Sequence, residues 1–322
     1  MRRKIFLFSF LILLMFVSVS FASEYGVYVK VVEKAKGSFD EVSNAVEGTL
    51  KNSGWEILAA YNSGVPAGCK FRSRVIVFSS PAYAKSIISN SVKASFALPL
   101  RAGIYEDETG INVAVVNPSS INKTIVHETR LNDLSLSAIN PIVDAIAKAV
   151  PGNIVKKQIG EIRSKGRVGG MGGGDFLDKV EEVYVAHDGS DATFKKISEN
   201  VKRGILENKK NWKLIYTLDL SSHGAIIFGV TEAKMEGKAF KIAGEKRASD
   251  YYKFPGIDHG AAFPIEIIVY KDGGKVKVVI LDEMYRMKVY FEDAGKWAFM
   301  KNMGMPGQIE DEIIEMVKAN LK

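Results

Sequence analysis

Apolar and polar residues follow a helical repeat and then a strand repeat in the first part of the chain. Ser38 and Glu41 have the spacing of a capping box, and apolar residues then recur every three or four positions as far as Leu50. We predict that this helix ends at Gly54, because glycine readily adopts the left-handed backbone that closes a helix. A strand is predicted to begin at Trp55.

The same order of patterns returns in the second half of the chain. Apolar residues at 194–205 keep the helical spacing, and a strand is predicted to begin at Trp212. Both halves then continue into an apolar run and finish with a helix. The matching ranges are 75–78 and 225–228 for the runs, and 134–150 and 308–321 for the final helices.

A gapless match indicates an internal repeat. Residues 98–118 align with residues 263–283, and each row has two β-branched runs around a short polar turn, which predicts a β-hairpin. Most apolar positions of one row face apolar positions of the other. Identical pairs include Pro99 with Pro264, Tyr105 with Tyr270, Asp107 with Asp272 and Val113 with Val278.

The repeat predicts an α+β fold with two similar domains, each an antiparallel sheet with helices packed on one face. We expect the first domain at 23–165 and a second, diverged copy at 178–322. Between them, residues 166–177 are rich in glycine and predict a flexible linker. A phosphate-binding loop is the alternative, but the segment fits neither the P-loop nor the dinucleotide-binding spacing, and Asp175 would repel an anion.

The N-terminus has the three parts of a Sec signal peptide. Residues 2–4 are basic, residues 5–19 are apolar apart from two serines, and small residues precede a predicted cleavage after Ala22. An uncleaved membrane anchor is the alternative, but the apolar run is shorter than the ~20 residues that span a bilayer. We therefore expect residues 1–22 to be removed, and the rest of the chain to be periplasmic or secreted and free of the membrane.

Charge and cysteine content exclude further classes of function. The net charge is +7, but three basic residues lie in the predicted signal peptide, and the other 41 are interspersed with 37 acidic residues. Because no basic stripe forms, we expect no nucleic-acid partner. The single cysteine, Cys69, cannot form an internal disulfide. We expect a partly exposed, unpaired thiol there, with a reactive or intermolecular thiol as the alternative.

The reactive residues show no metal or catalytic signature. The four histidines have no zinc-binding spacing with one another or with Cys69. Asp188, beside His187, precedes a predicted helix, where helix capping is favoured over metal binding. Asp258 and His259 indicate either a plain turn or a loop that faces a ligand. We therefore expect no metal, no cofactor and no catalytic residue that the sequence alone identifies.

A set of short motifs in the first copy is shared with a known family. The motifs are Gly54-Trp55, the run from Phe78 to Ala84, Leu98-Pro99-Leu100-Arg101, Ile104-Tyr105-Glu106-Asp107 and Asn117-Pro118. Through them, residues 25–150 resemble the DUF302 domain of bacterial and archaeal proteins, whose function is unassigned, and the second copy resembles it more faintly. The resemblance implies a sheet backed by helices, as in TATA-binding-protein-like domains, and implies nothing about DNA.

The first copy departs from that family at two places. Many members have a Cys-Asn-Pro or Gly-Asn-Pro turn where this chain has Ser79, Ser80 and Pro81, and some have cysteine where it has Leu100. If a thiol at either place serves the family's activity, this copy lacks it. The serines instead predict a helix N-cap, with Pro81 in the first helical turn.

The second copy carries an insertion at 232–260 that is rich in lysine, glycine and tyrosine. Its aromatic residues align with no residues of the first copy. The repeat therefore gives no reason to place them in a core that the two copies share. We expect them at an interface with a partner. These candidate interface residues are Tyr251, Tyr252 and Phe254.

Two classes of function remain. The first is a periplasmic, non-enzymatic module that binds a small ligand or a protein partner in a cleft between the copies. The second is an enzyme, or a redox or metal carrier, whose groups meet only in space; Ser79, Arg101, His127 and Cys69 are its first candidates. The candidate ligand-binding residues are Ser79, Ser80, Arg101, His127, Asp258 and His259.

Overall fold

The computed structural model describes residues 26–126, 131–159, 167–168, 172–245, 255–291 and 296–321 of the chain. The predicted signal peptide, residues 1–22, lies outside these ranges. So do His127 and the three aromatic residues predicted for an interface, Tyr251, Tyr252 and Phe254. The expectations about these residues stay predictions.

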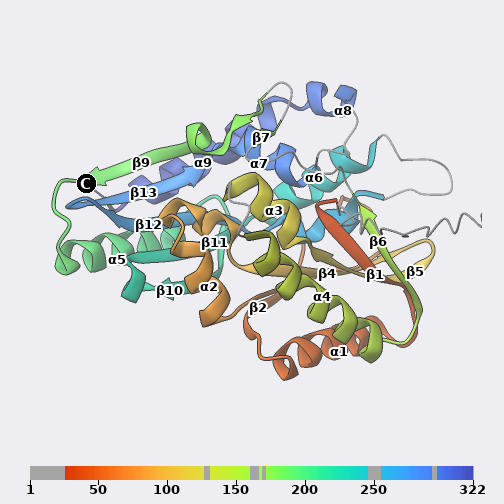
Figure 1. The fold of residues 1–322 in the computed structure, drawn as a ribbon. Coiled ribbons are helices and arrows are strands. Elements are labelled where there is room, and N and C mark those ends of the chain that lie inside the picture. Colours follow the sequence, from red (N-terminus) through yellow and green to blue (C-terminus); the bar gives the residue numbers. More distant parts are fainter. Residues whose placement is uncertain are drawn as a thin grey trace, which may run out of the picture.

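The first half of the chain forms a six-stranded antiparallel sheet with the strand order β2-β3-β4-β5-β1-β6 (Figure 1). The capping box at Ser38 and Glu41 starts α1, as predicted. The elements of this half are β1 (Tyr28–Ala35), α1 (Phe39–Asn52), β2 (Glu56–Asn62), β3 (Ser73–Ser79), α2 (Pro81–Ile88), the 3₁₀ helix η1 (Val92–Ala97), β4 (Leu100–Asp107), β5 (Gly110–Val116), α3 (Pro118–Ile125), α4 (Leu131–Ala149) and β6 (Asn153–Ile159).

The second half forms a five-stranded antiparallel sheet with the order β10-β11-β12-β13-β9. Its elements are β9 (Val180–Ala186), α5 (Asp191–Glu207), β10 (Lys213–Leu220), η3 (Ser221–His223), β11 (Ala225–Thr231), α6 (Ala233–Gly244), η5 (Pro255–Ala262), β12 (Ile265–Asp272), β13 (Lys275–Leu281), α7 (Glu283–Tyr290), α8 (Lys296–Lys301) and α9 (Gly304–Lys318).

The two sheets share one topology, which confirms the predicted repeat at the level of the fold. Strands β10-β11-β12-β13-β9 take the places of β2-β3-β4-β5-β1, and α5, α6, α7 and α9 follow the same strands as α1, α2, α3 and α4. A bulge begins in each sheet two residues after the matched tryptophan, Trp55 or Trp212. The peptide bonds before Pro99 and Pro264 are both cis. Strand β6 and helix α8 have no counterpart among the described elements.

The strand register corrects one part of the predicted alignment. Val77 pairs with Arg101 of β4, and Gly229 pairs with Glu266, which occupies the equivalent place on β12. Val77 therefore matches Gly229, two positions away from the predicted match of 75–78 with 225–228. Sequence alone could not fix this offset, because either alignment places apolar residues opposite apolar residues.

The predicted insertion at 232–260 is not wholly new structure. Helix α6 and the 3₁₀ helix η5 occupy the places that α2 and η1 hold in the first half. Ser80 caps α2 by accepting a hydrogen bond from the Tyr83 N–H, as predicted, and the carboxylate of Glu232 caps α6 in the same way from the Met235 N–H. Helix α6 is four residues longer than α2, η5 is two residues longer than η1, and the remaining additional residues of the second copy come between α6 and η5 in the sequence.

The glycine-rich segment is held against the protein at the residues that the structure describes there. Strands β7 (Arg167–Val168) and β8 (Gly174–Asp175) pair with each other, and η2 (Phe176–Lys179) follows. Val168 and Phe176 are both buried, and the Phe176 ring packs edge-on against Phe96 with ring centres 6.1 Å apart. The prediction of a flexible linker missed these two apolar anchors among the glycines.

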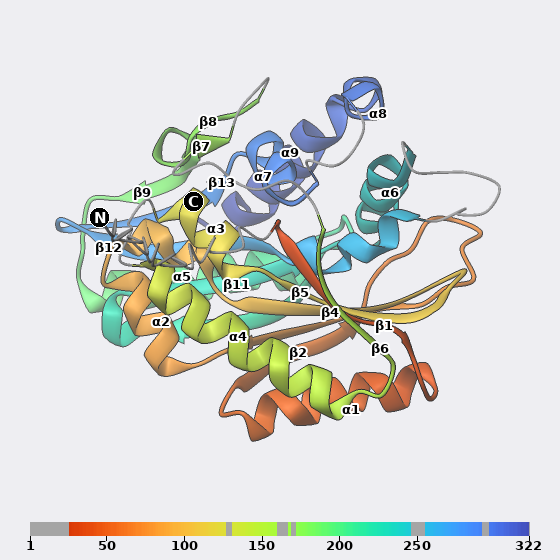
Figure 2. The same ribbon diagram turned by 45° about the vertical axis from the view of Figure 1, so that its right-hand side comes forward.

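Each sheet has one face covered by helices of its own half. Helices α1 and α4 lie side by side below the six-stranded sheet, and α5 and α9 contact each other on the five-stranded sheet (Figure 1). The other faces are shared: η5 packs on β3, β4 and β5 of the first half, while η1 contacts β12 of the second. Figure 2 shows α6 and α8 on the opposite side of the molecule from α1 and α4. None of the described helices has the length and apolar character that crossing a membrane requires.

Candidate functional site

A buried ion pair joins the two halves at equivalent positions of their sheets. Arg101 lies on β4, and Glu266 lies at the matching place on β12. Arg101 Nη1 is 3.1 Å from Glu266 Oε1, and the two side chains are only 2% and 3% exposed. The contact is electrostatic, because Glu266 Oε1 accepts no aligned hydrogen bond from the described residues. A pair this deeply buried is retained only where each charge is compensated.

Arg286 of α7 brings a second guanidinium to the same carboxylate. Its Nε lies 3.5 Å from Glu266 Oε2, and its Nη2 donates hydrogen bonds to the carbonyl oxygens of Ala262 and Pro264. Arg101 Nη1 donates to the same two carbonyl oxygens, at 3.3 and 3.0 Å. The end of η5 and the start of β12 are therefore clamped between two arginines, one from each half.

Tyr290 completes this charged layer from α7. Both guanidinium groups lie over its ring, at 4.8 Å for Arg101 and 5.1 Å for Arg286, which is cation–π distance. Its hydroxyl accepts a hydrogen bond from Arg101 Nη2. Burial by itself would lower the pKa of Arg101, but the nearby Tyr290 and Glu266 outweigh that effect and raise it. Arg101 is therefore a permanent cation.

The predicted pair Asp258 and His259 lies in the same interface. His259 Nδ1 is 2.8 Å from Asp258 Oδ1, and both side chains are buried. The His259 ring stacks on Phe291 and meets the Tyr28 ring edge-on. Three of the six candidate ligand-binding residues, Arg101, Asp258 and His259, thus meet between the halves. All three are buried, and Asp258 and His259 belong to the 3₁₀ helix η5, where the sequence analysis favoured a plain turn.

Ser79 lies near this layer, and Cys69 lies elsewhere. Ser79 ends β3 two residues after Val77, the partner of Arg101, so Ser79 and Arg101 share a face of the sheet. Cys69 precedes β3 in the loop from β2, is partly exposed and has no disulfide partner. Burial raises the pKa of its thiol, which keeps it protonated and weakly nucleophilic at neutral pH.

Two buried carboxyl groups were missed by the sequence analysis. Glu236 of α6 accepts hydrogen bonds from the Tyr61 hydroxyl, the Gly64 N–H and the Thr231 hydroxyl, and so ties the β2–β3 loop to the second half. Burial raises its pKa to about 7 against the effect of these donors. Glu236 stands among lysines and glycines in a segment that resembles an exposed helix, which gave no signal of burial.

Glu283, at the start of α7, is the second of these groups. Its two carboxyl oxygens are buried and accept no hydrogen bond from the described residues. Burial raises its pKa to about 8, although Arg286 acts in the opposite direction. Burial therefore favours the protonated, neutral form of Glu283.

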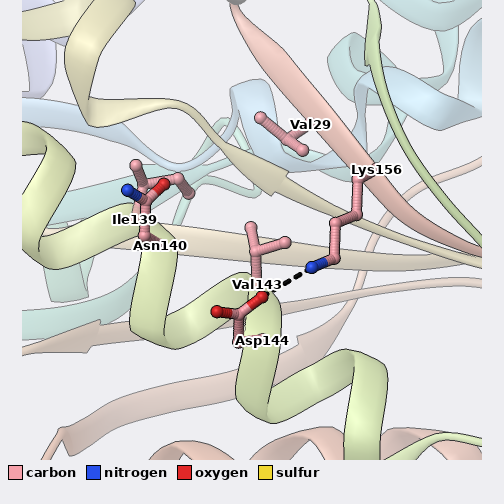
Figure 3. A pocket seen from close by; sticks show the side chains of 6 residues that line it. All are labelled: Val29, Ile139, Asn140, Val143, Asp144 and Lys156. Carbon is pink, nitrogen blue, oxygen red and sulfur yellow. Dashed lines mark hydrogen bonds and ion pairs between the residues drawn. The ribbon is translucent and has the colours of Figure 1, made fainter.

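A cavity of about 180 Å³ lies between α4, β1 and β6 (Figure 3). The sequence predicted a cleft between the two copies, whereas this cavity lies within the first half. Lys156 reaches from β6 to Asp144 on α4, with Nζ 2.6 Å from Oδ1. The hydrogen bond and charge of Lys156 hold the pKa of Asp144 below its ordinary value. The residues that line the cavity are Val29, Ile139, Asn140, Val143, Asp144 and Lys156.

Within the described part of the chain, no group of three or more histidine, cysteine, aspartate or glutamate side chains is arranged to hold a metal ion. Asp188 bonds to Ser190 and Thr193 at the start of α5. The N-cap of this helix is Ser190, so Asp188 supports the cap from outside the helix and does not itself occupy it.

The model of DUF302, a domain of unknown function, matches residues 30–149. Residues 30–149 are a DUF302 domain. This DUF302 domain extends from β1 to the end of α4 and contains Arg101, Ser79, Ser80 and one wall of the cavity. Strand β6 follows it, and two residues that line the cavity, Val29 and Lys156, lie outside the matched residues.

The whole chain was compared with the solved structures and with the curated proteins. The crystal structure of an uncharacterized conserved DUF302 protein from Bacillus stearothermophilus is similar, with 12% sequence identity and a TM-score of 0.32. The match covers 38% of this chain and 95% of that one. A search of the curated proteins finds no match.

Proposed function

We propose that the protein is an exported, non-enzymatic module that binds a small ligand in the cavity between α4, β1 and β6. The cavity carries this proposal, because it places polar side chains beside buried apolar ones in a hollow of about 180 Å³, which suits only a small molecule. The predicted signal peptide supports export. The second half is a diverged DUF302-like copy that packs against the sheet of the first half. The domain boundaries are those that the sequence predicts.

The arrangement of reactive groups supports binding over catalysis. The arginines, Glu266 and His259 between the halves have protein partners and are buried, so they are poorly placed to meet a substrate. Around the cavity the polar side chains are an amide, a carboxylate and an ammonium, and none is a serine or cysteine nucleophile. Burial raises the pKa of the Cys69 thiol, which lowers the fraction of nucleophilic thiolate at neutral pH.

Native mass spectrometry of the protein recovered from the exported fraction tests the proposal. We expect a chain that begins after Ala22 and carries an added small-molecule mass. The Val143→Phe variant, whose larger side chain fills the cavity, should lose that mass while it keeps its circular dichroism spectrum. The bare chain mass in both proteins, or the same added mass in both, would count against binding at this cavity.

A further inference from the structure

The cavity places one positive and one negative side chain above an apolar wall. Val29, Ile139 and Val143 are buried at 2%, 1% and 7% exposure. Asp144 and Lys156 stand at the rim and bond to each other across it (Figure 3). A ligand that fits this surface has an apolar part and a charged or strongly polar end.

The rim pair is suited to exchange with a ligand. The side chains of Lys156 and Asp144 are 46% and 57% exposed, and ion pairs this exposed contribute little to stability. Separating them therefore costs little, provided that each charge gains a new partner. A ligand with both an ammonium and a carboxylate supplies both partners, whereas a ligand with one charge leaves the other rim residue unpaired. Asn140, beside the rim, can bond to either group.

The backbone at Lys156 is shaped for this position. Between Lys30 and Val32 of β1 the pairing with β6 shifts by one residue, which forms a bulge that includes Lys156. Lys156 has φ of +44°, a left-handed conformation that is unfavourable for a lysine. Such a bulge can redirect a side chain, and here the Lys156 side chain reaches α4. Strained backbone of this kind is concentrated at functional sites.

The volume limits the size of the ligand. An apolar cavity of ~150 Å³ is large enough to bind benzene, so the cavity of about 180 Å³ has room for a slightly larger molecule. This space suits a molecule of roughly six to ten non-hydrogen atoms. An amino acid with a branched aliphatic side chain has that size and both charges.

We propose that the cavity binds a free aliphatic α-amino acid, with its ammonium on Asp144, its carboxylate on Lys156 and its side chain against Val29, Ile139 and Val143. This assignment rests on the proposed binding function and names the chemical class of its ligand. It predicts a preference for zwitterions over acids or amines of the same shape.

Isothermal titration of the mature protein with L-leucine tests the assignment. Two analogues isolate the charges: 4-methylpentanoate lacks the ammonium, and 3-methylbutylamine lacks the carboxylate. We expect L-leucine to bind at least ~10-fold more tightly than either analogue, and glycine to bind weakly because it leaves the apolar wall uncovered. Each of Lys156→Met and Asp144→Asn should weaken leucine binding at least ~10-fold. Lys157→Met, a matched change at the next, exposed residue of β6, should leave it unchanged.

Two further outcomes separate the assignment from the function on which it rests. If an analogue binds as tightly as leucine and only one rim variant has an effect, the cavity binds a singly charged ligand and the amino-acid assignment is wrong, while binding at the cavity stands. If no compound binds and the exported protein carries no added mass, both are wrong. Thermal unfolding of each variant shows whether a loss of binding reflects a loss of folding.

Discussion

Arg101 and Glu266 hold equivalent positions in the two sheets, and they form an ion pair with each other across the interface between the halves. The pair therefore lies where the two copies of the repeat meet. Arg286, Tyr290 and two backbone carbonyl groups surround it. The stability of the whole molecule should depend on this layer more than on any other polar contact described above.

Loss of either partner of this pair should destabilise the fold. Arg101→Met leaves Glu266 with one guanidinium, and removal of a buried ion-pair partner typically costs about 3–5 kcal/mol. Glu266→Gln should cost at least as much, because it leaves two buried guanidinium groups without a carboxylate. Urea unfolding measures both. The exposed pair of Lys51 and Glu47 is the control, since Lys51→Met should change stability by less than about 1 kcal/mol. Equal small effects at both sites would contradict this prediction.

Glu283 should make stability depend on pH. In the unfolded chain its carboxyl group ionises near pH 4.5, whereas in the fold its pKa is raised to about 8. Its contribution to stability is therefore fully present below pH 4.5 and is lost as the pH rises to about 8. Glu283→Gln removes the titration, so the variant should lose less stability over this range than the unaltered protein. Urea midpoints measured at several pH values test this, and parallel curves for the two proteins would refute it.

Cys69→Ser should leave folding intact. The thiol is partly exposed, and its contact is a long one of 3.8 Å to the Phe71 carbonyl oxygen. We expect a change in the free energy of unfolding within about 0.5 kcal/mol, as for most surface substitutions. Differential scanning calorimetry measures it. A large drop in melting temperature would instead place Cys69 in the core.

Ala22→Arg should prevent removal of residues 1–22, because signal peptidases require a small residue before the cleaved bond. The intact mass of the exported or membrane-bound protein should then include these residues. Val17→Leu, within the apolar run, keeps the features of a signal peptide and should be cleaved normally. Cleavage of the Ala22→Arg protein at the same bond would show that this residue does not define the site.

The repeat could be predicted because its hairpins keep proline, tyrosine and aspartate at fixed spacing. Those residues identify both copies without a structure. One sign of the interface was also present in the alignment, where Arg101 stands opposite Glu266 near the start of two strands that otherwise carry no charge as far as Tyr105 and Tyr270. Because Arg101 and Glu266 carry opposite charges at equivalent positions, the alignment already indicated that these two positions contact each other across an interface between the halves.

The cavity and the buried carboxyl groups left no such sign. Lys156 follows α4 in a run with two lysines, and its left-handed backbone arises from a bulge that depends on pairing with β1. Glu236 is in contact with Gly64 of the β2–β3 loop of the other half, to which it is hydrogen-bonded. Both features depend on contacts between segments far apart in sequence, which local patterns do not encode.

The opposite charges at the matched positions also restrict which halves can associate. Two first halves arranged like this chain would bring arginine against arginine, and two second halves would bring glutamate against glutamate. Like charges held together in a dry interface are strongly disfavoured. Each half thus accepts only its complement, and the covalent link between them keeps that complement at high local concentration. Exchange of halves between neighbouring molecules would have to follow the same pairing rule.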